Sequence, residues 1–237
     1  MRISFKRKFI FLANRRCGST SVRKALDPTS DVKGSRPGPL DHHACLRTVE
    51  RYVVTQGYRL QDFFIFTTIR NPWARVVSIY HYGLREPASI WHAASKEAGS
   101  FHAFCFHPVL DQVFGLGSTV PECPQDINSF TSSVAAVPVD AYDCSPAGFH
   151  AMQEKLRGDV GLPTVFIQHA NASEHPPYAA FYADPKFGHA ARARIAELFE
   201  CDVSFGYTFE DETAQFPRLT LPLKAISGNR ARPDATP

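Results

Sequence analysis

The chain has 237 residues, of which 44% are hydrophobic, 12% aromatic and 21% charged, and its formal net charge is +3. This composition excludes a disordered chain, and its length predicts one substantial hydrophobic core. We expect no membrane span, because no apolar run approaches the roughly 18 residues that a transmembrane helix requires.

The small net charge hides an uneven distribution. The first 24 residues contain eight Lys or Arg and no acidic residue, whereas the remainder contains 18 basic and 23 acidic residues, a balance of −5. This asymmetry predicts a concentrated positive site near the N-terminus of an otherwise slightly acidic protein.

Cysteine usage and the N-terminal residues bear on the compartment. The six cysteines are scattered without a Cys-x-x-Cys pair, and residues 1–8 lack the apolar stretch of a secretory signal. We therefore expect reduced thiols and a cytoplasmic protein. His102, Cys105 and His107 lie close together in the sequence, but three phenylalanines surround them and no second ligand cluster follows, which favours a core segment over a metal site.

The first half of the chain predicts strands that alternate with helices. Apolar, aromatic-rich runs over residues 8–13 and 63–69 are typical of strands that are buried on both faces. The first is followed by a polar loop and a short helix that Asp27 and Pro28 end, and the second by a helix with Pro72 at its first position. Between them, we expect Asp41 to cap a helix that Gly57 closes. This order favours an α/β fold with a parallel sheet in a single domain.

The pattern is weaker in the second half. We expect an apolar helix over residues 101–114, strands over 135–139 and 164–169, and a helix whose core-facing residues run from Phe187 to Phe199. We assign residues 1–217 to the domain and 218–237 to a C-terminal tail that a ligand could order.

The loop after the first strand has the features of an anion cradle. Gly18 permits close backbone approach, the helix that follows directs N–H groups and a positive dipole end at one point, and Ser19, Thr20 and Ser21 add hydroxyl donors. Arg15 and Arg16 supply full positive charges. Gly-Ser-Thr alone is equally typical of an ordinary helix cap, so the two arginines and the acid-free flank decide for an anion site.

A second group of residues follows the second strand. Arg70 stands at the strand's C-terminal end, where open α/β sheets bind ligands, and Ser78 lies about two turns into the next helix. A guanidinium can fork onto a phosphate, and the serine hydroxyl can add a donor. The loop lacks the first Gly and the Lys of a nucleotide-kinase loop, and the second strand does not end in an acid, so we expect a ligand that is not held through Mg²⁺.

Both segments resemble sulfotransferases that use 3′-phosphoadenosine 5′-phosphosulfate (PAPS). Residues 9–21, FIFLANRRCGSTS, look like the loop that binds the 5′-phosphosulfate, and residues 66–80, FTTIRNPWARVVSIY, look like the motif in which an Arg and a Ser eight residues later hold the 3′-phosphate. Residues 171–207, from Asn171-Ala172-Ser173 through Phe205-Gly206-Tyr207, resemble the C-terminal block of the carbohydrate-type branch. Residues 85–160 match little that we can place.

The resemblance implies a P-loop-like sheet flanked by helices, transfer of a sulfuryl group to a hydroxyl of a carbohydrate or other polar acceptor, and no metal cofactor. It implies PAPS contacts from Arg15, Arg16, Cys17, Gly18, Ser19, Thr20, Ser21, Arg70 and Ser78. Arg16 stands where the family usually has Lys, which keeps the positive charge but provides a poor proton donor to the leaving group.

The acceptor needs a base, and two histidines are candidates. The segment 42–44 resembles a Lys-His-Ala segment of related enzymes, which maps the family's histidine onto His43 and leaves His42 as second choice. We expect both in the first helical turn after Asp41, where the helix dipole disfavours the charged imidazolium.

Two other functions stay open. One is a divergent P-loop kinase, which requires Mg²⁺-dependent ATP binding. The other is a degenerate family member that binds a nucleotide or polyanion without turnover, which the Arg at position 16 allows. We expect no nucleic-acid partner, because the basic run continues directly into a core strand.

Overall fold

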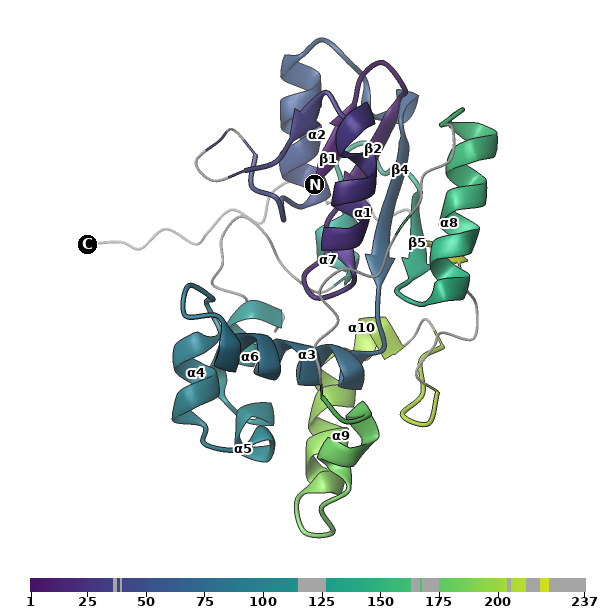
Figure 1. Cartoon of the computed structure of the whole chain (residues 1–237). Helices are drawn as coiled ribbons and strands as arrows, with labels where there is room; N and C mark the ends of the chain where they lie inside the picture. Colours follow the sequence, from purple (N-terminus) through teal and green to yellow (C-terminus); the bar gives the residue numbers. More distant parts are fainter. Residues whose placement is uncertain are drawn as a thin grey trace, which may run out of the picture.

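A six-stranded mixed sheet forms the centre of the protein in a computed structural model (Figure 1). The model describes residues 1–35, 38, 40–114, 127–162, 167, 175–203, 206–211 and 218–221. Within these residues the strand order is β3-β1-β2-β4-β5-β6. The strands are β1 (Arg2–Ser4), β2 (Phe9–Leu12), β3 (Val32–Lys33), β4 (Phe64–Ile69), β5 (Val139–Asp143) and β6 (Arg218–Leu221).

The expectation of a single α/β domain is confirmed, and the expectation of a parallel sheet holds only for its centre. Strands β2, β4 and β5 are parallel neighbours, whereas β1, β3 and β6 pair antiparallel with theirs. The expected strand over 135–139 begins instead at Val139. The first four residues of the segment assigned to the tail form β6, and residues 222–237 lie outside the described part of the chain.

Helices cover both faces of the sheet because the strands alternate their side chains. Phe9 and Phe11 of β2 pack with α1 (Ser19–Leu26) and α8 (Pro146–Asp159), while Ile10 and Leu12 join the larger cluster with α2 (Leu46–Thr55) on the other face. The described residues also form four short helices: η1 (Asp27–Thr29), η2 (Leu60–Asp62), α7 (Ile127–Thr131) and η3 (Tyr178–Tyr182).

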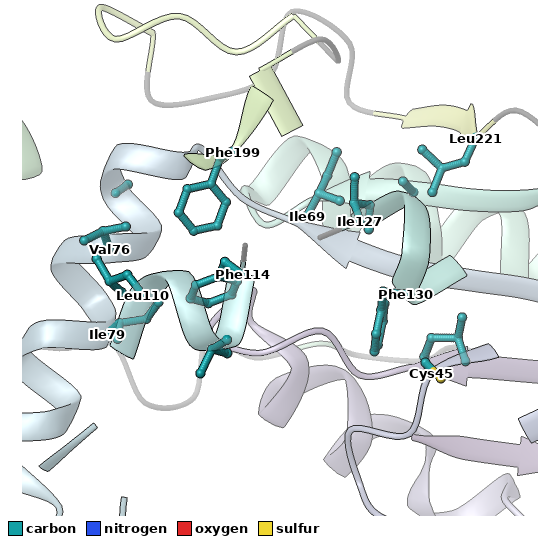
Figure 2. Packing of buried hydrophobic residues seen from close by; sticks show 14 of the residues in the cluster. Cys45, Ile69, Val76, Ile79, Leu110, Phe114, Ile127, Phe130, Phe199 and Leu221 are labelled. Atoms are coloured by element: carbon teal, nitrogen blue, oxygen red, sulfur yellow. The ribbon is translucent and has the colours of Figure 1, made fainter. Parts of the chain in front are cut away.

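A second group of helices lies beyond the carboxyl ends of the parallel strands, in the lower part of Figure 1. It comprises α3 (Pro72–Arg85), α4 (His92–Glu97), α5 (Phe101–Cys105), α6 (Pro108–Phe114), α9 (Gly188–Leu198) and α10 (Glu200–Val203). Figure 2 shows how Phe114 of α6 and Phe199 meet beside Val76 and Ile79 of α3. These helices therefore lie next to the edge of the sheet at which β2 and β4 end.

Several predicted elements differ in detail. The helix expected over 101–114 is two helices, α5 and α6, because Pro108 lacks the N–H that a continuous helix needs. Phe187, expected in the core, is 47% exposed. The strand expected over 164–169 lies outside the described residues except for Ile167, which is buried. No helix among the described residues is long and apolar enough to cross a bilayer.

Candidate functional site

The loop after β2 is a sharply turned connection between a buried strand and α1. Arg16 has a backbone φ of 59° and Gly18 of 68°, so two residues adopt the left-handed conformation within three positions. A Cβ on Gly18 would lie 2.8 Å from both Cys144 Sγ and Phe149 Cζ. Glycine is therefore required at this position both by the backbone angle and by the neighbouring side chains.

The start of α1 follows Gly18 directly. The Gly18 carbonyl accepts hydrogen bonds from Ser21 N at 3.1 Å and Val22 N at 3.5 Å, so the amides of Ser19 and Thr20 precede the first helical hydrogen bond. Thr20 is half-buried, and its Oγ1 accepts a hydrogen bond from Arg23 Nη2 at 3.3 Å. The amides at this helix end and its dipole suit an anion.

Cys17 lies inside this loop but has the chemistry of a buried thiol. Its Sγ donates to the Arg15 carbonyl at 3.4 Å, and burial raises the pKa of the thiol to about 11. The nearby Cys144 thiol is similar, because burial raises its pKa to about 12. Raised pKa values favour the neutral thiol in both groups at neutral pH, which disfavours a nucleophilic role.

The structure brings Arg16 and Ser78 together although 62 positions separate them. Arg16 Nε and Nη2 donate to Ser78 Oγ at 3.1 and 2.8 Å, and the guanidinium lies 4.4 Å from the ring centroid of Tyr82. Burial and the adjacent Arg70 charge lower the pKa of Arg16 to about 10. The loop and the segment that follows β4 thus meet at Arg16 and Ser78, and the mutual repulsion of the Arg16 and Arg70 charges would favour an anion beside them.

Arg70 stands where β4 ends, and the residues after it fix the start of α3. Asn71 Oδ1 accepts from Ala74 N at 3.1 Å, and Pro72 occupies the first helical turn. Asn71 Nδ2 also donates to the carbonyls of Thr208 and Asp211, at 2.9 and 2.7 Å. One buried amide therefore caps α3 and fastens the C-terminal segment beside Arg70.

His43 lies close to the loop, but not in a helix. Helix α2 begins at Leu46, and Asp41 Oδ1 accepts from His43 N at 2.7 Å in a turn before it, so the expected helix-dipole effect on the histidines is wrong. His43 Nδ1 donates to the Ala13 carbonyl at 2.6 Å, which places the imidazole proton on Nδ1. Burial, and next the Arg15 charge, lower the pKa of His43 to about 3.

His42 is directed elsewhere. Its Nδ1 lies 2.9 Å from the Gly34 carbonyl, and its own carbonyl accepts a hydrogen bond from the N-terminal amine of Met1. These contacts tie His42 to the antiparallel edge of the sheet. The geometry therefore favours His43 over His42 as the site histidine.

At least three of the eight basic residues near the N-terminus have partners away from the loop, so the positive charge is less concentrated than expected. Arg2 pairs with Asp27 at 2.5 Å, Arg7 Nη1 donates to the Gly161 carbonyl at 3.0 Å, and Lys8 Nζ lies 4.1 Å from the Tyr58 ring centroid. Arg15 and Arg16 belong to the loop, and the positive charge that lowers the pKa of Arg16 most is that of Arg70, which directly follows β4.

Sequence reasoning missed Arg75, which is 0% exposed on α3 and bonds to the loop backbone. An arginine among the apolar residues Trp73, Val76 and Val77 was a usable signal, because a buried guanidinium needs partners.

It also missed Asp143, the buried acid at the end of β5, which accepts a hydrogen bond from Tyr207 Oη at 2.5 Å. A divergent P-loop kinase would need an acidic residue at this edge of the sheet to hold Mg²⁺, and Asp143 lies there. No group of three or more His, Cys, Asp or Glu placed to hold a metal occurs in the described part of the chain.

Comparisons of the chain with models of protein families, with curated proteins and with solved structures returned no match.

Proposed function

We propose that this protein is a PAPS-dependent sulfotransferase that transfers a sulfuryl group to a hydroxyl of a carbohydrate or another polar acceptor. The observation that carries the proposal is the junction of Arg16, Arg70 and Ser78 at the carboxyl edge of β2 and β4, next to the N-terminus of α1. It combines fixed amide donors, hydroxyls and guanidinium groups around the ends of two neighbouring parallel strands.

The residues present fit a ligand with two separated anionic groups. The loop and the first amides of α1 suit the 5′-phosphosulfate, and Arg70 with Ser78 suits the 3′-phosphate. Ser78 Oγ accepts both hydrogen bonds from Arg16 and is only 1% exposed, so the Arg16 side chain must move aside before the hydroxyl can donate to a phosphate oxygen. Bound PAPS would supply an activated sulfuryl group with an anionic phosphate as leaving group.

His43 is the proposed base. Because Nδ1 carries the proton given to the Ala13 carbonyl, Nε2 carries the lone pair that accepts the proton of the acceptor hydroxyl. The acceptor oxygen then forms its bond to sulfur as the bond from sulfur to the departing phosphate oxygen breaks. Arg16 neutralises charge on that oxygen without giving up a proton. An anion bound beside Arg15 would offset the positive charge and raise the pKa of His43 from its low value.

The binding step is tested with 3′-phosphoadenosine 5′-phosphate (PAP) in EDTA. We expect PAP to raise the melting temperature of the wild type without Mg²⁺ and to have no effect on Arg70→Ala. Arg59→Ala is the matched control, because Arg59 is an exposed arginine paired with Asp62 at 2.7 Å, and it should respond like the wild type. Absence of a shift at millimolar PAP would contradict the proposal, and Mg²⁺-dependent stabilisation by ATP would favour the kinase.

The transfer step is tested by PAP release from PAPS with a panel of hydroxyl acceptors. We expect acceptor-dependent release that His43→Ala lowers at least about a hundredfold, the range of a lost general base. His42→Ala is the matched control and should keep most of the activity. Equal background rates in all three proteins, together with PAP binding, would favour the degenerate binding protein.

A further inference from the structure

Arg75 is a charged side chain in the core, and it contacts the loop after β2, residues 13–18, which we call the anion loop. Its Nη2 donates to Asn14 Oδ1 at 2.7 Å and its Nε to the Arg15 carbonyl at 3.1 Å. Asn14 is itself fully buried. Because Asn14 and Arg15 immediately precede Arg16, the guanidinium holds the backbone at the point where the chain enters its left-handed turn.

The other side of Arg75 is held by residues far along the chain. Its Nη1 lies 3.4 Å from Asp202 Oδ1 in α10, and both side chains are almost completely buried. The guanidinium carbon lies 4.8 and 5.4 Å from the ring centroids of Phe114 and Phe199. Figure 2 shows these two rings side by side next to α3, and their centroids are 4.8 Å apart. A planar guanidinium suits this environment, which offers aromatic rings and several fixed acceptors.

The same helix contacts the loop at a second point. Ser78 follows Arg75 by three residues, so both side chains lie on one face of α3. Arg75 holds the loop's backbone, and Ser78 receives the Arg16 side chain. Both contacts therefore act on the part of the loop that carries Arg16.

We propose that Arg75 is a positioning residue for the anion loop: it fixes the backbone of Asn14 and Arg15 so that Arg16 is directed toward Ser78 and Arg70. Asp202 and the rings of Phe114 and Phe199 hold the guanidinium in place. The shape of the loop thereby depends on the docking of α10. The identity of the ligand that the loop binds rests on the proposed function, whereas the effect of Arg75 on the loop backbone does not.

The test uses Arg75→Lys, which keeps the charge opposite Asp202 but cannot reach the Asn14 and Arg15 oxygens with a rigid fork. Amide hydrogen exchange is measured in the ligand-free full chain, with peptides that cover residues 13–21 compared with peptides of α2. We expect at least about tenfold faster exchange in the loop peptides alone, and PAP affinity about tenfold or more weaker, as for one lost charge-assisted hydrogen bond.

Arg192→Lys is the matched control. Arg192 also lies over an aromatic ring, 4.0 Å from the Phe209 centroid, and donates to a backbone carbonyl, that of Tyr182 at 3.4 Å, but it does not contact the loop. It should leave exchange in the loop and PAP affinity unchanged.

The outcomes separate this inference from the proposed function. Faster loop exchange in Arg75→Lys supports the positioning role even if the wild type binds no PAP, a result that would remove the sulfotransferase proposal alone. Unchanged loop exchange overturns the positioning role. Faster exchange of equal size in the loop and in α2 also overturns it, because the residue would then stabilise the whole domain. If Arg75→Lys does not fold, Asp202→Asn must show the same loop-selective exchange, and its absence overturns the role.

Discussion

The two strand-to-helix connections at the carboxyl edge of the sheet are built differently. The connection after β4 consists of Arg70 and Asn71, and the Asn71 side chain caps the helix that it begins. The connection after β2 runs over residues 13–18, contains two left-handed residues, and begins a helix whose N-cap, Gly18, has no side chain to cap it. It is held instead by Arg75 and Ser78 of α3.

The two connections therefore differ in which residues determine their conformation. The helix start at the second connection is specified locally, by the Asn71 cap and by Pro72 at the first helical position. The first depends on side chains of α3 and on the space left by Cys144 and by Phe149 of α8. We therefore expect the first connection to be sensitive to distant changes, and the second to changes within it.

The largest expected effect is that of Gly18→Ala. The new Cβ would lie 2.8 Å from Cys144 Sγ at a φ of 68°, and we expect a loss of about 2 to 4 kcal/mol in the free energy of unfolding. Gly57→Ala is the control, since Gly57 has a φ of 80° with nothing within 4 Å, and strain alone should cost about 1 kcal/mol. Equal losses in urea unfolding would contradict the close packing of the first connection.

A second test addresses the connection after β4. Asn71→Ala removes a helix cap and leaves the carbonyls of Thr208 and Asp211 without their donor, so we expect a loss of about 2 to 3 kcal/mol. Ser145→Ala removes only a cap, the bond to Gly148 N at 3.2 Å, and should cost about 1 kcal/mol. Equal losses for the two variants would mean that the contacts to the C-terminal segment contribute nothing.

His43 gives the first connection a pH dependence. The pKa of His43 is about 3 in the folded protein and near 6.5 in the unfolded chain, so between these values the unfolded state binds the additional proton. Stability should therefore fall as the pH falls below about 6.5, and His43→Gln should reduce this fall by about 2 kcal/mol at pH 5. Parallel stability curves for the two proteins from pH 7 to pH 5 would show that burial does not hold the imidazole neutral.

The smallest expected effect joins the two connections. Ser78→Ala removes the hydroxyl that receives Arg16 and, in the proposed function, one donor to the 3′-phosphate. We expect PAP affinity to fall about three- to tenfold in calorimetry with little change in melting temperature. Ser78→Thr, which keeps the hydroxyl, should fall less. A larger loss for Thr than for Ala would place the effect in packing.

The sequence predicted the centre of the fold because its patterns are local. Continuous apolar runs identified β2 and β4, and Pro72 identified the start of α3. Strands β1 and β3 contain three and two residues, too few for a recognisable period, and they make the sheet mixed.

The candidate site was predictable to the same extent. The residue types in the loop and around Arg70 were enough to predict that these two segments contribute to a candidate site. The turn at His43 was not predicted, because it depends on a hydrogen bond to the Asp41 side chain. The role of Arg75 depends on Asp202, 127 positions away, which no local pattern reveals.

The most direct test of the two-anion site compares PAP with adenosine 5′-monophosphate, which lacks the 3′-phosphate, by calorimetry in EDTA. The account predicts that the wild type binds PAP at least about tenfold more tightly, the effect of one charge-assisted contact, and that Arg70→Ala removes this preference. Equal affinity of the wild type for the two nucleotides, or a preference that survives Arg70→Ala, would contradict it.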